Sequence, residues 1–139
     1  MTDIDNVAVL GTGTLGSQII MQAAYAGKNV TAYDISDEIL DKLPARWEWM
    51  RGFYSHDVEG FTDEKFDAAI ARITPTTDMK AATENAGIVI EAVPENIELK
   101  HKVYKELCEY VSDDCILATN SSYLLPSEIA PAVTKPERF

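Results

Sequence analysis

Cysteine is scarce in this chain of 139 residues, because Cys108 and Cys115 are its only thiols. One pair of cysteines is too few for a four-cysteine zinc site or for the disulfide framework of a small secreted domain. Basic residues are also scarce, with 12 Lys and Arg against 23 Asp and Glu and a formal net charge of -11. Most of such a surface repels a phosphate backbone. We therefore expect reduced thiols, a cytoplasmic protein, no metal site and no nucleic-acid partner.

Charge is absent altogether from residues 6–27, a stretch long enough to suit a membrane span. The stretch nevertheless contains four glycines and several polar side chains, and acidic rather than basic residues precede it. These features are atypical of a transmembrane helix and of a signal peptide. We therefore expect no membrane partner.

The chain also has no internal repeat and no linker rich in Ser, Gly or Pro. Its length suits one domain, and its 46% content of hydrophobic residues is sufficient for a core. We therefore expect residues 1–139 to form one domain.

Short apolar segments alternate with segments of helical periodicity along the chain. The expected strands are residues 6–10, 29–35, 88–93 and 115–119, and a short run at residues 73–76 precedes the third of them. The expected helices are residues 14–26, a helix after the N-cap Ser36, an irregular stretch 45–73 whose Trp47, Met50 and Tyr54 enter the core, and residues 97–111. Such uniformly apolar strands are typical of parallel sheets that helices cover on both faces. The sequence therefore predicts an α/β fold with a doubly wound parallel sheet.

A glycine-rich turn joins the first strand to the first helix. Gly11, Gly13 and Gly16 form the pattern G-x-G-x-x-G. In such a turn the first glycine allows the tight bend, the second lets the backbone approach a diphosphate, and the third lets the helix pack against the strand. The helix N-terminus adds free N–H groups and the positive end of a dipole. The pattern predicts dinucleotide binding; a turn that serves chain geometry alone, and binding of a flavin or another adenine nucleotide, are the alternatives.

Asp34 ends the second strand, at the spacing from the glycine loop where such folds bind the adenine ribose. A carboxylate there accepts hydrogen bonds from the ribose hydroxyls and repels the additional phosphate of NADP. No Lys or Arg follows among Ile35, Ser36 and Asp37 to neutralise that phosphate. We therefore predict NAD rather than NADP.

Polar residues follow two later strands, at the edge where open parallel sheets bind ligands. Residues 94–96 (Pro-Glu-Asn) come after one strand, and residues 120–122 (Asn-Ser-Ser) come after the other. On physical grounds alone, the first segment could equally be a helix start and the second an ordinary turn.

Three segments of the chain resemble a known family. VAVLGTGTLGSQI, EAVPENIELK and ATNSSYLLPSEIA occur in the order and spacing of the NAD-binding domain of 3-hydroxyacyl-CoA dehydrogenases, enzymes of fatty-acid metabolism. The resemblance covers about residues 5–139. It implies reversible hydride transfer between C3 of a 3-hydroxyacyl or 3-keto substrate and NAD.

The resemblance also implies roles for individual residues. Glu95 and Lys100 correspond to residues that contact NAD, and Ser122 corresponds to a serine that hydrogen-bonds the substrate oxygen at C3. Asn120 begins the loop that presents this serine, and we take Ser122 and Asn120 as the candidate catalytic residues. The candidate cofactor residues are Gly11, Gly13, Thr14, Leu15, Gly16, Asp34, Ala92, Val93, Glu95, Lys100 and Asn120.

The proton acceptor of the family has no counterpart in this chain. It is a histidine in a segment that follows an Arg-Phe pair like Arg138-Phe139, where this sequence ends. We expect His56 and His101 to be ordinary surface residues. The resemblance therefore implies a fragment of a longer enzyme, homodimeric through a helical C-terminal domain, and an isolated chain that binds NAD without turnover.

Two positions depart from the family. Counted without gaps from Asp34, the Ser and Lys that contact coenzyme A in the family are replaced by Met50 and Asp57. Asp57 would repel a phosphate-bearing ligand. A diketoreductase-like reductase of small β-keto compounds is therefore an alternative, as the TNSS and LLPS segments also resemble that branch. A non-catalytic NAD-sensing module is a third interpretation.

Overall fold

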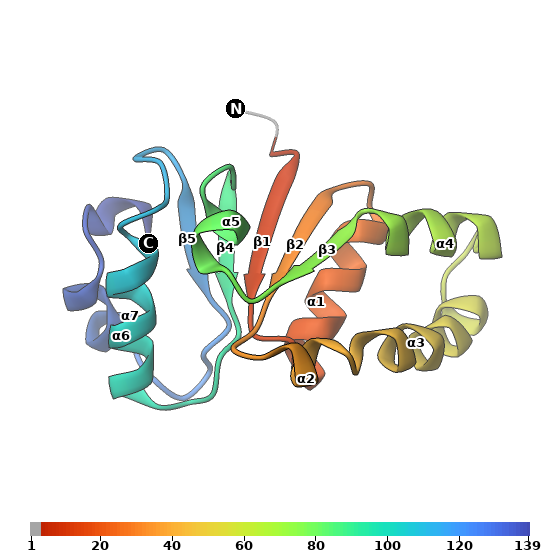
Figure 1. The fold of residues 1–139 in the computed structure, drawn as a ribbon, viewed down its shortest axis with the longest axis horizontal. Helices are drawn as coiled ribbons and strands as arrows, with labels where there is room; N and C mark the ends of the chain where they lie inside the picture. Colours follow the sequence, from red (N-terminus) through yellow and green to blue (C-terminus); the bar gives the residue numbers. More distant parts are fainter. Residues whose placement is uncertain (1–3) are drawn as a thin grey trace.

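The structure, a computed structural model, describes residues 4–139 and contains one five-stranded sheet of order β3-β2-β1-β4-β5, in which all strand pairs are parallel (Figure 1). The strands are β1 (Asn6–Leu10), β2 (Asn29–Tyr33), β3 (Ile73–Thr76), β4 (Ile88–Glu91) and β5 (Ile116–Thr119). The helices are α1 (Thr14–Tyr25), α2 (Asp37–Leu40), α3 (Leu43–Asp57), α4 (Asp63–Ala71), α5 (Met79–Thr83), α6 (Ile97–Leu107) and α7 (Pro126–Ile129). Two 3-10 turns follow, Ala130–Ala132 and Pro136–Arg138.

The register places the ends of four strands at one level. Leu10, the last residue of β1, pairs with Tyr33 of β2 and Glu91 of β4, and Glu91 pairs with Thr119 of β5. The carboxyl ends of these strands therefore meet at one edge of the sheet, the lower edge in Figure 1. Strand order reverses on either side of β1, which is where ligands bind in folds of this kind.

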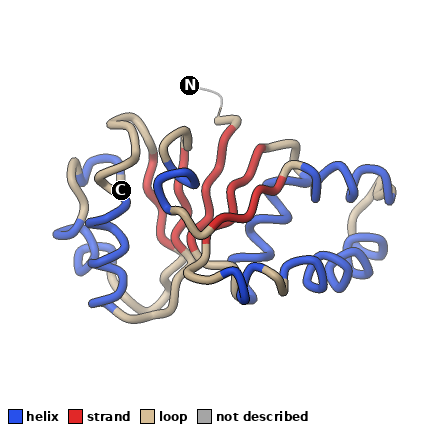
Figure 2. Tube along the Cα trace, in the orientation of Figure 1, coloured by secondary structure: helices blue, strands red, loops and turns tan. Residues whose placement is uncertain are grey.

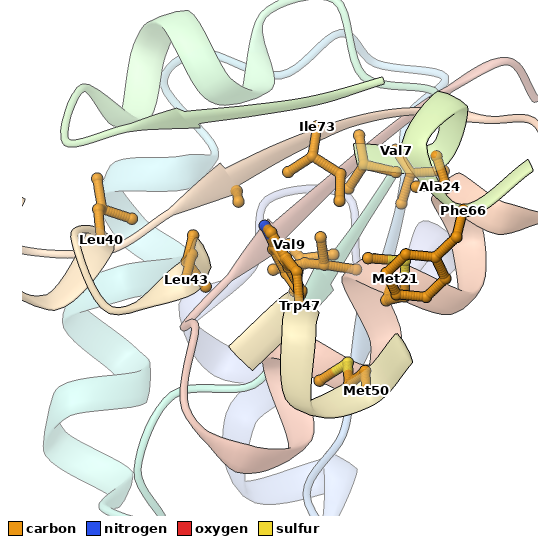
Figure 3. Close-up of a cluster of buried hydrophobic side chains, with 14 residues drawn as sticks. Val7, Val9, Met21, Ala24, Leu40, Leu43, Trp47, Met50, Phe66 and Ile73 are labelled. Carbon is orange, nitrogen blue, oxygen red and sulfur yellow. The ribbon is translucent and has the colours of Figure 1, made fainter. Parts of the chain in front are cut away.

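Helices cover both faces of the sheet, as the doubly wound fold predicts. Side chains alternate along β1, so that Val7 and Val9 face α1, α3 and α4, while Ala8 and Leu10 face α5, α6 and α7. Figure 3 shows the first of these clusters, in which Trp47 is 4% exposed beside Val9.

The predicted aromatic stripe on α3 is confirmed as a core feature. Trp47 and Met50 are each 4% exposed, and the ring of Tyr54 meets Phe66 edge-on at 5.4 Å between centroids. Helix α6 ends at Leu107, four residues before its expected end at residue 111. Its Lys100, Val103, Tyr104 and Leu107 share one buried face, and Val111, beyond the helix, is buried as well.

The irregular stretch 45–73 forms a helical hairpin that leans away from the sheet, on the right in Figures 1 and 2. The break falls at Gly60, whose φ is +74°, and Thr62 caps α4 by accepting a hydrogen bond from the Lys65 N–H. Arg51 of α3 forms ion pairs with Asp63 and Asp67 of α4. Helix caps and one multiply paired cation thus hold the hairpin together.

Two predicted strands end two residues early. At each end a carboxylate side chain accepts a hydrogen bond from a backbone N–H one or two residues further along. Strand β2 ends at Tyr33 because Asp34 accepts a hydrogen bond from the Ile35 N–H through its own side chain. Strand β4 ends at Glu91, whose side chain accepts the N–H of Val93. Helix α5, which the sequence did not predict, has Asp78 as its N-cap.

The outer strands of the sheet differ in character. Strand β3 carries Pro75, which has no amide hydrogen to donate, whereas β5 reads Ile-Leu-Ala-Thr and its Ile116 is 45% exposed. Cys108 and Cys115 are free thiols, as predicted. No helix within residues 4–139 is long and apolar enough to cross a membrane.

Candidate functional site

A cleft of about 720 Å³ opens at the carboxyl edge of the sheet. It is lined by the glycine loop, by the residues that follow β2 and β4, by α6, and by the loop after β5. Every candidate cofactor and catalytic residue lines this cleft: Gly11, Gly13, Thr14, Leu15, Gly16, Asp34, Ala92, Val93, Glu95, Lys100, Asn120 and Ser122. The structure therefore brings together residues that are up to 111 positions apart, from Gly11 to Ser122 (122 − 11).

The glycine loop has the geometry that its pattern predicts. Gly11 has a φ of +101°, and a Cβ atom there would lie 2.5 Å from the carbonyl oxygen of Ala92. A Cβ atom on Gly16 would collide with the carbonyl oxygen of Gly11, so only glycine lets α1 approach the loop this closely. At Gly13 a Cβ atom would meet nothing within 4 Å, which leaves the space above the loop open.

Asp34 faces this loop. Its Oδ2 atom accepts hydrogen bonds from the Thr12 N–H at 2.8 Å and from the Thr12 hydroxyl at 2.7 Å, and its Oδ1 atom accepts from the Ile35 N–H at 2.8 Å. Thr12 is 1% exposed, whereas Asp34 is only half-buried. The carboxylate is thus fixed beside the loop with one side open to the cleft.

These groups fit a dinucleotide. Helix α1 begins at an N-cap glycine, and among residues 4–139 no side chain caps it and no acid lies in its first turn, which leaves its first N–H groups available to a diphosphate. Asp34 supplies acceptors for a ribose at one side of the loop. The donor and acceptor set therefore suits NAD, with the diphosphate on the glycine loop.

A buried ion pair closes the other side of the cleft. Glu91 is 0% exposed and Lys100 is 1% exposed, and the Lys100 Nζ atom lies 2.7 Å from Glu91 Oε2. Lys100 also reaches Glu95 Oε1 at 2.9 Å. The predicted cofactor residue Lys100 is therefore shared between two carboxylates.

Glu95 links this pair to the loop after β5. Its Oε2 atom accepts a hydrogen bond from the Ser121 hydroxyl at 2.6 Å. The bonds from Lys100 and Ser121 lower the pKa of Glu95 to about 2. Glu95 is therefore ionised at neutral pH, although its side chain is 40% exposed.

The candidate catalytic loop is fixed by its backbone. The Asn120 N–H donates to the carbonyl oxygen of Glu91 at 2.8 Å, and the Ser121 N–H donates to the hydroxyl of Thr119 at 3.1 Å. Ser122 comes next and is exposed on the cleft. Its hydroxyl is thus presented from a tethered turn.

The two histidines of the chain and the two positions that depart from the family lie outside the cleft. His56 is on the exposed end of α3, and His101 is half-buried, with Nε2 2.5 Å from the carbonyl oxygen of Glu128. Met50 packs in the core and Asp57 is exposed at the last residue of α3. The position of Met50 therefore does not present its side chain to a ligand in this cleft.

Some residues at and near the cleft were not predicted from the sequence. Glu91 and Ser121 do not line the cleft, but they contact Lys100 and Glu95, which do. Lys42, the N-cap of α3, Arg46 in the first turns of α3, and Lys102 of α6 also line the cleft. Their i, i+4 spacing was the only signal for Lys42 and Arg46, and such spacing is common on exposed helices.

Comparisons with known proteins agree with this geometry. The family described as "3-hydroxyacyl-CoA dehydrogenase, NAD binding domain" matches residues 6–139. The alpha subunit of the fatty acid oxidation complex of Psychrobacter cryohalolentis is 39% identical over 137 residues, which are 99% of this chain and 19% of that protein. A probable 3-hydroxyacyl-CoA dehydrogenase of Caenorhabditis elegans is 31% identical over 142 residues, covering 100% of this chain and 48% of that protein.

Two solved structures are similar over the whole chain. A diketoreductase has a TM-score of 0.95 and 43% identity, covering 100% of this chain and 49% of its own. The 3-hydroxybutyryl-CoA dehydrogenase of Escherichia coli has a TM-score of 0.90 and 32% identity, covering 99% of this chain and 29% of its own. The chain thus spans less than half the length of these relatives. It belongs to the 3-hydroxyacyl-CoA dehydrogenase family and corresponds to the NAD-binding domain of these oxidoreductases.

Proposed function

We propose that this chain is the cofactor-binding part of an NAD-dependent enzyme that oxidises a 3-hydroxyacyl substrate, or reduces the 3-keto form, in fatty-acid metabolism. The observation that carries the proposal is that Asn120 and Ser122 line the same cleft as the glycine loop and Asp34. A cofactor held by the loop and a substrate oxygen held by Ser122 would share this one space.

Residues on one side of the cleft bind the cofactor, and Ser122 on the other side binds the substrate. The first turn of α1 binds the diphosphate, and Asp34 binds the adenine ribose. NAD, when bound, supplies the hydride acceptor. The Ser122 hydroxyl hydrogen-bonds the oxygen on C3 of the substrate and orients that carbon toward the cofactor side.

Oxidation of an alcohol also requires a base for the hydroxyl proton. Neither His56 nor His101 lines the cleft, and Glu95, which does, is already bonded to Lys100 and Ser121. We therefore propose that the 139-residue chain binds NAD but does not turn over. A longer protein would supply the base, the rest of the substrate site and a homodimer contact. We also propose that it acts in the cytoplasm.

Isothermal calorimetry of the chain with NAD and with NADP tests the binding step. The proposal requires heat of binding with NAD, weaker binding of NADP, and no steady production of NADH when a 3-hydroxyacyl-CoA is added. Absence of NAD binding by folded protein would refute the proposal.

A second candidate is a diketoreductase-like reductase of small β-keto compounds. The 43% identity to a diketoreductase supports it, as does the buried Met50 where the family contacts coenzyme A. A longer protein that carries this domain would distinguish the two: faster reduction of acetoacetyl-CoA favours the first function, and faster reduction of a β-diketo ester favours the second. An NAD-sensing role without chemistry would give neither activity, and such a role does not require Ser122 in the cleft.

A further inference from the structure

The ion pair between Glu91 and Lys100 is buried more deeply than stability alone would favour. Both side chains are withdrawn from water, at 0% and 1% exposed, with 2.7 Å between Nζ and Oε2. Removing two charges from water is costly, and well-packed apolar residues of similar volume are often as stable or more stable. The pair therefore calls for a role beyond packing.

Glu91 is held rigidly at the end of β4. Besides Lys100, its carboxylate accepts hydrogen bonds from the Val93 N–H at 2.9 Å and from the Thr119 hydroxyl at 2.7 Å. These donors come from three segments of the chain: the turn after β4, helix α6 and strand β5. They fix the carboxylate in position, because every one of them donates a hydrogen bond to it.

Lys100 connects the buried Glu91 to a residue at the surface of the cleft. Its Nζ atom bonds Glu91 in the interior and Glu95 Oε1, at 2.9 Å, on the cleft side. Glu95 in turn accepts the Ser121 hydroxyl, in the loop that carries Asn120 and Ser122. One continuous chain of contacts therefore runs from the sheet to the candidate catalytic loop.

The charges of this chain of contacts do not cancel. Glu91 and Glu95 carry two negative charges and Lys100 carries one positive charge, so the three side chains together carry a charge of about one negative unit. They lie beyond β4, on the opposite side of β1 from Asp34. A dinucleotide whose adenine ribose binds Asp34 extends across β1 and brings its nicotinamide end to these residues.

We infer that Glu91 is a positioning residue, which fixes Lys100 and Glu95 so that a net negative charge faces the nicotinamide end and favours the oxidised cofactor. The inference rests on the proposed function, because it requires NAD in this cleft. The oxidised ring carries a positive charge that the reduced ring lacks, so the charge beside the ring distinguishes the two forms. Glu91 needs no contact with the cofactor to act in this way.

The test compares the affinities of the 139-residue chain for NAD+ and for NADH, measured by calorimetry, in the wild type and in Glu91→Gln. The substitution keeps the shape of the side chain and brings the charge of the group to zero. We expect the preference for NAD+ over NADH to fall by about threefold to tenfold. A purely structural role would weaken the binding of both forms equally and leave their ratio unchanged.

Glu98→Gln is the matched control. Glu98 is an exposed residue at the start of α6, the helix that carries Lys100, and does not line the cleft. Because both variants replace one glutamate by glutamine, they have the same net charge. It should retain the wild-type ratio. An equal shift in the control would mean that overall charge, and not this group, sets the preference, and would overturn the inference.

Ser121→Ala provides an independent variant if Glu91→Gln does not fold. Ser121 is half-buried in a loop, and its loss frees Glu95 Oε2 without burying any unpaired charge. The NAD+ preference should again fall, by a smaller factor. An unchanged ratio in either folded variant would overturn the inference, whereas failure of the wild type to bind both forms would refute the proposed function instead.

Discussion

The hydroxyl of Thr12 donates a 2.7 Å hydrogen bond to Asp34, and the backbone N–H of the same threonine donates to the same carboxylate oxygen at 2.8 Å. Thr12 lies inside the glycine loop and Asp34 follows the neighbouring strand. The glycine loop and the carboxylate that follows β2 are therefore joined by hydrogen bonds of the protein itself. A buried threonine at the cleft thus holds the carboxylate that we propose binds the ribose.

Thr12→Val tests this preorganisation. Valine keeps the shape of threonine but removes the hydroxyl donor, so Asp34 is held less firmly toward the cleft. We expect NAD affinity to fall by about fivefold, equivalent to about 1 kcal/mol for one lost hydrogen bond. Calorimetry measures the change. Thr31→Val, in the same sheet but outside the cleft, should bind NAD as the wild type does.

Asp34→Ser tests the choice of cofactor. The substitution removes the charge that accepts the ribose hydroxyls and repels the additional phosphate of NADP. NAD binding should lose about 1.5–3 kcal/mol and the NAD-to-NADP preference should fall at least tenfold. Parallel titrations with both nucleotides measure it. An unchanged preference would show that Asp34 does not face the ribose.

Gly16→Ala tests the close packing of α1 against the loop. The added Cβ would collide with the backbone oxygen of Gly11, so the helix has to shift. Unfolding in urea should show a loss of about 1–3 kcal/mol, the range found for overpacked sites. Gly52→Ala, in the exposed middle of α3 with nothing within 4 Å, should instead gain about 0.5–1 kcal/mol.

The lowered pKa of Glu95 predicts that the folded protein loses stability in acid. Glu95 has its pKa lowered from 4.5 in the unfolded chain to about 2 in the folded protein, first by Lys100 and then by Ser121. Its contribution to stability is therefore complete above pH 4.5 and is lost as the pH falls through about 2. Glu95→Gln should unfold more easily than the wild type at pH 7, and the difference should shrink between pH 4.5 and 2. Urea midpoints across this pH range measure it, with Glu98→Gln as the exposed control on α6.

Ser122→Ala separates catalysis from cofactor binding. In a longer protein with activity, loss of the hydroxyl that orients the C3 oxygen should lower kcat by about 100-fold. NAD affinity should stay within error of the wild type, because no part of the ribose or diphosphate site changes. Unchanged turnover would remove Ser122 from the mechanism.

The sequence predicted the parts of the site that are local. Strand β1 has its predicted bounds, and Gly11, Gly13 and Gly16 sit at the strand-to-helix turn, because a short apolar strand and a glycine pattern are encoded in adjacent residues. The family resemblance added Glu95, Lys100 and Ser122, which all line the cleft. Local pattern and motif together therefore located the cleft.

What could not be predicted depends on contacts between distant segments. A single acid in the apolar strand IVIEAV gives no sign that Glu91 is fully buried, because its partners come from α6 and β5. Helix α5 was missed because Met79–Thr83 is too short to show a helical period. Strand β2 ends early through a side-chain contact of Asp34, which residue propensities do not encode.

The two edge strands of the sheet, β3 and β5, differ in how readily a further strand can pair with them. On β3, Pro75 removes an amide donor, which discourages a further strand from pairing there. On β5, the uncharged residues Ile116–Thr119 pair with β4, and no other strand among residues 4–139 pairs with them. Addition of a strand, whether from further sequence or from a second molecule, is therefore directed to β5. Titrations with the 139-residue chain should be made at protein concentrations where sedimentation shows a single species.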